Sequence, residues 1–231
     1  MDFFEAVKKR RSVRNYSDEK VPEAIIHKAL EAAILAPNSS NTQTWDFHWV
    51  KNQDKKIKLV EACLSQFAAK TASDLIVVTA NSHLWKRSQK PLLDWAISTK
   101  APKPVQDYYE KMIPLMYRYG FLNSIGYIKF LIIFFVGLFR PMPRGPNLKR
   151  DLQEVAIKSA ALASENLMLA ISAQNYDSCP MEGFDEIRVR RLLNLNRHYK
   201  VVMVIAIGKG TEQGTWGPQM RLPFNDVVHI Y

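Results

Sequence analysis

The segment Arg10-Arg11-Ser12-Val13-Arg14 concentrates guanidinium groups and a hydroxyl within five residues. Arginine binds phosphate through paired, charge-assisted hydrogen bonds, so this spacing is suited to surrounding a phosphate group. The segment follows a stretch with helical periodicity, and positive charge at the end of a helix also complements the helix dipole. The pattern by itself therefore fits a phosphate site or an ordinary basic helix end.

Two further clusters carry polar chemistry without a catalytic signature. The segment from Ala36 to Trp45 is rich in amide and hydroxyl groups, which can bind a polyol or the edge of a heterocycle, although a plain helix-to-strand turn explains it equally well. The segment from Cys179 to Asp185 runs from a proline to a glycine, and glycine lets a backbone approach a flat ligand closely. The candidate side chains of these two clusters are Pro37, Asn38, Ser39, Asn41, Gln43, Pro180, Met181, Glu182 and Gly183.

The periodicity of apolar residues predicts the elements that position these clusters. Helices are expected over Asp2–Arg10, Pro22–Ile34, 53–68 and 151–173, with several short, proline-broken helices over 83–116. Strands are expected over Trp45–Lys51, Asp74–Thr79, Tyr199–Ile207 and Asp226–Ile230. Helix 151–173 carries small residues and is expected to be central and buried. Irregular alternation of helices and strands favours one α+β domain over residues 1–231, around a small mixed sheet.

The segment 120–146 is the least regular part of the chain. Its apolar run, 130–139, is about half the length needed to cross a bilayer as a helix, so it is not a transmembrane span on its own. It is followed by the loop-forming sequence RPMPRGP. A lid over a site, a helix buried in a dimer core and a membrane-surface contact all remain open for this segment.

Composition narrows the function classes. With 47% apolar and 23% charged residues, the chain is expected to fold around a core rather than to be disordered. Two cysteines and no evident secretory signal favour a reducing, cytoplasmic compartment. The net charge of +10 suits nucleic acid, an anionic membrane surface or an anionic small molecule. Nucleic acid is disfavoured because the basic clusters 8–11 and 188–191 lack interleaved aromatic residues, and five dispersed histidines predict no metal site.

Taken together, four motifs resemble the nitroreductase family of flavin-dependent oxidoreductases. They are RRSVR at residue 10, APNSSNTQTW ending at Trp45, PMEGFD from Pro180 and RLP at Arg221. The resemblance implies an α+β nitroreductase-like fold, with a central mixed or antiparallel sheet flanked by helices, in an intertwined homodimer. It also implies bound FMN, NADH or NADPH as electron donor, and a ping-pong reduction of nitroaromatic, quinone or similar acceptors.

The resemblance also implies roles for the candidate residues. Arg10, Ser12 and Arg221 would hold the FMN phosphate, with Arg11 beside them, and Arg14 would reach the pyrimidine edge of the flavin. Residues 37–43 would line the flavin from the partner subunit, and residues 180–183 would cover one face of it. No side chain is expected to act as a catalytic acid, because the cofactor carries the chemistry.

The sequence departs from the family at Asn38, at Thr44 and at Gln219, where some members carry a second phosphate-binding lysine. Whether Gln66 or Lys70 touches the flavin is left open, because their spacing to Asp74 matches the family poorly. Two alternatives keep the fold. One is a family member that performs dehalogenation or flavin breakdown, and the other is a non-catalytic FMN-binding or membrane-associated protein.

Overall fold

A four-stranded sheet forms the centre of the computed structural model, which describes residues 1–231. The strands are β1 (Trp45–Trp49), β2 (Asp74–Ala80), β3 (Asp177–Met181) and β4 (Lys200–Gly208), in the spatial order β1-β2-β4-β3. Every neighbouring pair is antiparallel. The α+β prediction is confirmed, but the sheet is antiparallel rather than mixed, since the one parallel pairing is an isolated bridge between Ser12 and Ser178.

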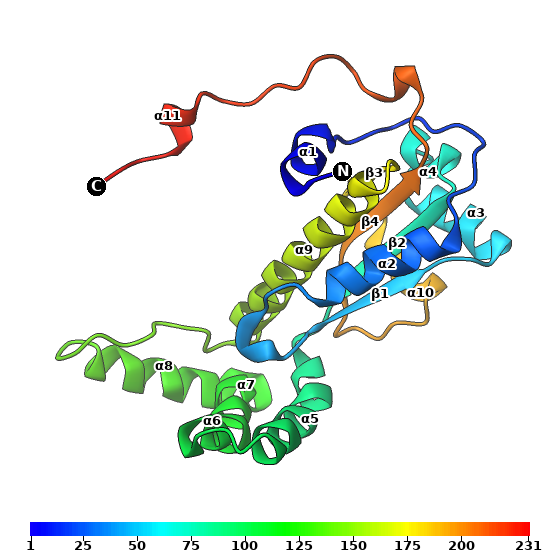
Figure 1. Cartoon of the computed structure of the whole chain (residues 1–231). Coiled ribbons are helices and arrows are strands. Elements are labelled where there is room, and N and C mark those ends of the chain that lie inside the picture. The colour runs from blue at the N-terminus through cyan, green and yellow to red at the C-terminus, as the bar shows by residue number, and fades with distance from the viewer.

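Eleven α-helices surround or extend from this sheet (Figure 1). They are α1 (Phe3–Lys9), α2 (Glu23–Ile34), α3 (Gln53–Ala62), α4 (Phe67–Thr71), α5 (Trp85–Ser98), α6 (Lys103–Asp107), α7 (Ile113–Tyr117), α8 (Ser124–Val136), α9 (Lys149–Ala173), α10 (Glu186–Leu192) and α11 (Phe224–Val227). The prolines in 83–116 divide that region into short helices, as predicted, although Pro91 lies within α5.

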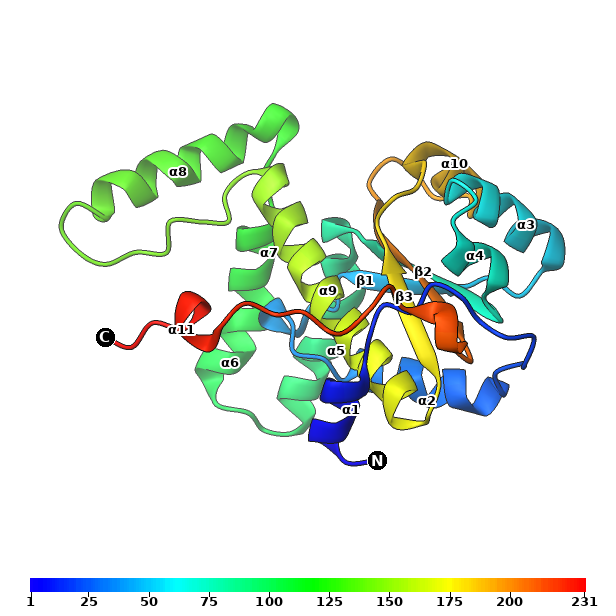
Figure 2. The same cartoon turned by 90° about the horizontal axis from the view of Figure 1, so that it is seen from above.

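The two faces of the sheet are covered by different helices. Alternate residues of a strand point to opposite faces. Ile76 and Ile205 accordingly pack in one core with residues of α2 and α9, whereas Leu75 and Val204 pack in a second core with residues of α3, α4 and α10. Figures 1 and 2 show α2 and α9 together on one side of the sheet. Both faces are thus apolar, which explains the nearly continuous hydrophobic sequence of β2 and β4.

Helix α9 is the central buried helix that its sequence predicts. Its small residues Ala160 and Ala163 are fully buried in the same core as Ala29 and Ala33 of α2, so the two helices approach closely. By length and composition α9 is one helix that could cross a membrane, with half of the relevant stretch buried inside the protein. A second candidate exists only if the helical segments Lys103–Tyr117 and Phe121–Val136 are taken together as one span. These two segments are bent by 88° at the break between them.

Two sequence predictions about single elements need correction, and one strand was not predicted. The helix expected over 53–68 is broken between α3 and α4, where Leu64 and Ser65 adopt positive φ angles. The strand expected over 226–230 does not form: residues 224–227 make one helical turn, and the tail lies away from the sheet, without a strand to pair with (Figure 1). Strand β3 was not expected, because its sequence DSCPM is polar and contains a proline. As the edge strand of the sheet it tolerates Pro180.

Candidate functional site

Two neighbouring cavities share Arg14, which lies beside β3. The larger has a volume of about 570 Å³ and the smaller about 160 Å³. The larger is lined by Arg14, Asn15, Gln66, Phe67, Ala68, Cys179, Pro180, Met181, Glu182, Gln213 and Trp216. The smaller is lined by Arg10, Arg11, Ser12, Arg14, Gln219, Met220 and Arg221. The structure therefore brings together the first motif, the third motif and Arg221, which are far apart in the sequence.

An extended segment after α1 positions the arginines. The N–H of Val13 donates to the carbonyl of Ser178 on β3 at 3.2 Å, and the N–H of Arg14 donates to the carbonyl of Gly214 at 2.7 Å. The segment is thereby held between the edge strand and the loop after β4. Val13 is buried, and a Cβ atom at Gly214 would lie only 2.6 Å from its Cγ1 atom, so this close approach requires a glycine.

The smaller cavity is strongly electropositive. Four arginines line it and no carboxylate does. Arg10 pairs with Glu165 of α9 at 3.4 Å, but Arg11, Arg14 and Arg221 form no ion pair. Arg11 instead donates to the carbonyl of Gly217 at 2.7 Å, which ties the first motif to the start of the C-terminal tail. Unpaired guanidinium groups around a small polar hollow form a site suited to a phosphate-sized anion.

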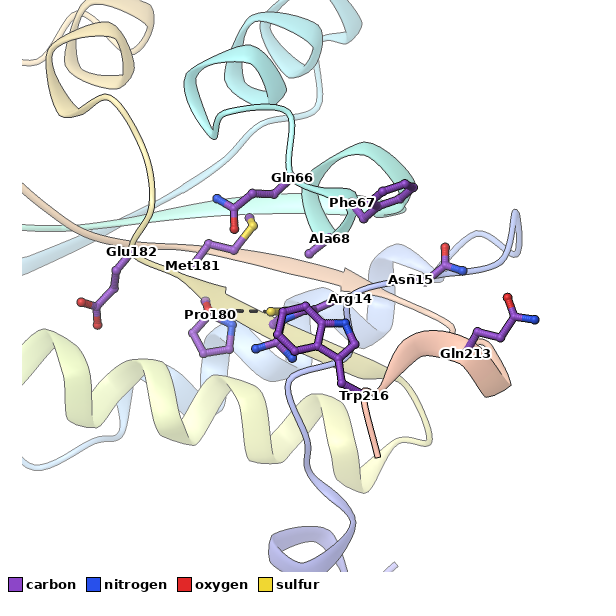
Figure 3. Close-up of a pocket in the computed structure, with 11 residues that line it drawn as sticks. Arg14, Asn15, Gln66, Phe67, Ala68, Pro180, Met181, Glu182, Gln213 and Trp216 are labelled. Atoms are coloured by element: carbon purple, nitrogen blue, oxygen red, sulfur yellow. Dashed lines mark hydrogen bonds between the residues drawn. The ribbon is translucent and has the colours of Figure 1, made fainter. Parts of the chain in front are cut away.

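The larger cavity has the more apolar lining, and Figure 3 shows its side chains. The Arg14 guanidinium lies 4.1 Å from the centre of the Trp216 ring, a cation–π contact at the edge of the cavity near Pro180. Beyond the end of β3, the backbone N–H groups of Glu182 and Gly183 donate no hydrogen bond within the chain. They are available donors at the edge of a cavity that can accept a planar group.

Gln66 belongs to this cavity and Lys70 does not. The Gln66 amide nitrogen donates to the carbonyl of Gly183 at 2.6 Å and to that of Cys63 at 2.9 Å, so it braces the loop after β3. Lys70 lies over the ring of Phe67, 5.9 Å from its centre, and lines neither cavity. The structure thus separates two residues between which the sequence could not choose.

Cys179 lines the larger cavity but is almost completely buried. Burial raises the pKa of its thiol, and this effect outweighs the opposing influences of Arg14, Ser12 and Arg10. A thiol with a raised pKa is protonated near neutral pH and is a poor nucleophile. Cys179 therefore acts as a small buried residue of the cavity wall.

The second motif lies elsewhere. None of residues 37–43 lines either cavity. The loop sits between α2 and β1, where the N–H of Ser39 donates to the hydroxyl of Ser159, in the middle of α9, at 3.5 Å. It is held there by a hydrogen bond between the Ser40 and Tyr108 hydroxyls at 2.6 Å and by one between the Thr42 and Tyr117 hydroxyls at 3.0 Å. Within one chain, this motif therefore does not meet the other two.

Comparisons with known proteins agree with this arrangement of motifs. The sequence model of the nitroreductase family matches residues 7–209. The chain belongs to the nitroreductase family. DrgA of Synechocystis sp. is 33% identical over 213 residues, which cover 92% of this chain and 86% of DrgA. MhqN of Bacillus subtilis, whose name proposes an NAD(P)H nitroreductase, is 28% identical over 98% of both chains.

The fold of this nitroreductase-family chain also matches solved structures. A proposed nitroreductase of Exiguobacterium sibiricum, crystallised in complex with FMN, superposes with a TM-score of 0.74. It is 26% identical, and the match covers 100% of this chain and 98% of that one. The resemblance inferred from four short motifs is therefore confirmed over nearly the whole chain.

The sequence analysis missed part of the candidate site. Trp216, Gln213, Phe67 and Asn15 line the larger cavity but were not candidates. Trp216 is followed by Gly217-Pro218, which indicates a loop but does not place the tryptophan at a cavity. Phe67 carried no such signal, because its position depends on the break between α3 and α4.

Proposed function

We propose that this protein is an FMN-dependent NAD(P)H oxidoreductase. The observation that carries the proposal is the pairing of a small cavity, lined by four arginines and no carboxylate, with a wider cavity that shares Arg14. A phosphate attached to a planar ring system has this shape and charge. The combined size falls within the range of cofactor-sized pockets in proteins. The FMN-containing relative and the name of MhqN support the same assignment.

The residues present fit FMN. Arg11, Ser12 and Arg221 would hold the phosphate, with Arg10 behind them against Glu165. The ring system would lie in the larger cavity, where Pro180 and Met181 offer an apolar surface. Bound FMN supplies the transfer of electrons between a nicotinamide donor and an acceptor.

The chain's own contribution is electrostatic. The Arg14 guanidinium, held at 4.1 Å over Trp216, would place positive charge beside the ring and so stabilise negative charge that develops there. The free N–H groups of Glu182 and Gly183 would donate to a ring nitrogen. No side chain in the cavity needs to serve as a nucleophile.

We infer that the working unit is a homodimer in which residues 37–43 complete the partner's site. Large apolar side chains are exposed on α1 at Phe3 and Phe4 and at the end of α2 at Leu35. Residues 216–231 are all exposed, and the part of the tail that carries α11 runs away from the rest of its own chain (Figures 1 and 2). Exposed apolar surface on this scale is typical of an interface. A partner that covers it would bring Asn38, Ser39, Asn41 and Gln43 to a site that they do not reach in cis.

The acceptor would be a small aromatic molecule such as a quinone or a nitroaromatic compound, reduced in a ping-pong cycle at the cavity vacated by the nicotinamide. We place this activity in the cytoplasm, in keeping with two free, buried cysteines.

The test is steady-state oxidation of NADH and NADPH by the FMN-loaded protein, with a quinone and a nitroarene as acceptors. Parallel double-reciprocal plots are expected. An FMN-loaded protein that oxidises neither donor would refute the catalytic proposal and favour a non-catalytic flavin-binding protein.

A further inference from the structure

Helix α8 and its flanks, residues 120–140, form an arm that projects from the body of the protein (Figure 2). The arm is fastened near its base. The N–H of Gly126 donates to the carbonyl of Tyr119 at 3.1 Å, and the Lys129 ammonium donates to the carbonyl of Met116 at 2.9 Å. Gly126 is the single buried residue of α8. The remainder of the helix is largely uncovered by its own chain.

The arm is apolar around its whole circumference. Successive residues of a helix are separated by about 100°, so exposed side chains at Phe130, Leu131 and Ile132 already face three directions. Phe134 and Phe135 extend the same pattern into the next turn. A helix that packs on one protein surface carries an apolar stripe and a polar face, whereas a helix apolar on all sides requires an apolar medium around it.

The arm and its flanks carry only positive charge, and Asp151, at the start of α9, is the carboxylate near the base of the arm. Between residues 112 and 150 there are six lysines and arginines and no aspartate or glutamate. None of the six forms an ion pair within the chain. Arg118 precedes the helix, while Arg140 and Arg144 follow it, so cations flank the apolar surface at both ends. This arrangement is complementary to anionic lipid headgroups above a hydrocarbon layer.

We propose that the 120–140 arm docks the protein on the surface of an anionic membrane. The helix has 13 residues and is therefore about 20 Å long, shorter than the hydrocarbon core of a bilayer. The 88° bend between it and the preceding helical segment prevents the two from forming one straight span. The arm would thus lie in one leaflet and would not cross. This proposal concerns binding alone and does not depend on the proposed redox activity.

The test is flotation of the full-length protein with vesicles of phosphatidylcholine, with and without phosphatidylglycerol. The protein is expected to float with the phosphatidylglycerol vesicles at low salt and to be released as salt rises. Leu131→Gln combined with Phe135→Gln should lower the bound fraction roughly tenfold or more. Ile57→Gln, which alters an exposed apolar residue of α3 far from the arm, is the matched control and should bind like the wild type.

A second measurement keeps the proposal testable if the Leu131→Gln/Phe135→Gln variant does not fold. Both native cysteines are buried, so an environment-sensitive fluorophore can be attached selectively at Phe135→Cys. Its emission should shift to the blue when phosphatidylglycerol vesicles are added. Absence of flotation at low salt, or an unchanged emission, would overturn the proposal. Two other results together would show instead that a second copy covers the arm. They are emission that is already blue-shifted without vesicles, and a Leu131→Gln/Phe135→Gln variant with a smaller particle mass than the wild type.

Discussion

At the scale of single residues, Arg11 and Arg221 test the phosphate site. Both line the smaller cavity and neither has a carboxylate partner, so each is free to bind an anion. Loss of one charge-assisted hydrogen bond costs about 1.5–3 kcal/mol. Arg11→Ala or Arg221→Ala should therefore raise the Kd for FMN roughly 10- to 150-fold, as measured by quenching of flavin fluorescence.

The control for these variants is Arg191→Ala on α10. Arg191 is exposed and lines neither cavity, so its removal changes the net charge by the same amount without touching the site. Its Kd for FMN should match that of the wild type. Equal losses of affinity in all three variants would mean that the general positive field, and not the arginine cavity, attracts the phosphate.

Gln66 and Lys70 form a natural pair for a second residue-scale prediction. Gln66 holds the carbonyl of Gly183 at 2.6 Å, whereas Lys70 lines neither cavity. A neutral hydrogen bond contributes about 0.5–1.5 kcal/mol, so Gln66→Ala should weaken FMN binding about 2- to 10-fold. Lys70→Ala should leave the Kd unchanged. A reversed order in titrations of the two variants would contradict the geometry of the loop after β3.

At the scale of elements, the end of β4 sets the path of the arginine-bearing segment. A Cβ atom at Gly208 would lie 2.7 Å from the ring of Tyr16, which is buried and bridges Gly210. Gly208→Ala should therefore destabilise the fold by about 1–3 kcal/mol and lower Tm by roughly 2–12 °C in thermal denaturation. Lys200→Ala, at the exposed start of the same strand, loses only a surface ion pair with Glu186 and should change Tm much less. Equal Tm shifts in the two variants would show that the Tyr16 ring can move aside at no cost in stability.

The sequence could predict the elements that are buried in the core, because burial determines their pattern of apolar residues. Helix α9 and strands β2 and β4 lie in the core, so their periodicity and apolar runs report directly on structure. Strand β3 was missed because an edge strand can contain Pro180 and polar residues. The tail was misassigned because β-branched residues at its end lack a neighbouring strand. Local pattern predicts an element only where packing within the chain selects that pattern.

The site divides in the same way. The first and third motifs could be predicted to cooperate, and the bridge between Ser12 and Ser178 joins them. A role for residues 37–43 came only from the family resemblance and not from their residue types, because they would act on a partner. Trp216 was missed because its place over Arg14 depends on the path of a loop without secondary structure.

At the scale of the whole molecule, the shared site predicts complementation between damaged chains. The double variant Arg11→Ala/Arg221→Ala and the loop variant Asn41→Ala/Gln43→Ala should each bind FMN weakly. Refolded together in equal amounts, they form mixed dimers in which one site is intact, so about a quarter of all sites should recover. Light scattering should give twice the 26.6 kDa of one chain. No recovery, with dimers present, would mean that residues 37–43 serve their own chain or no site.

The most direct test of the account is the visible absorption spectrum of the FMN-loaded wild-type protein, recorded anaerobically before and after addition of NADH and NADPH. Bleaching of the flavin absorbance, much faster than for the same concentration of free FMN, is the predicted result. The double variant Arg11→Ala/Arg221→Ala should lose its bound flavin, and the flavin absorbance should then bleach no faster than that of free FMN. A wild-type protein that binds no FMN, or whose bound FMN neither nicotinamide can reduce, would contradict the assignment of the arginine cavity to a redox cofactor.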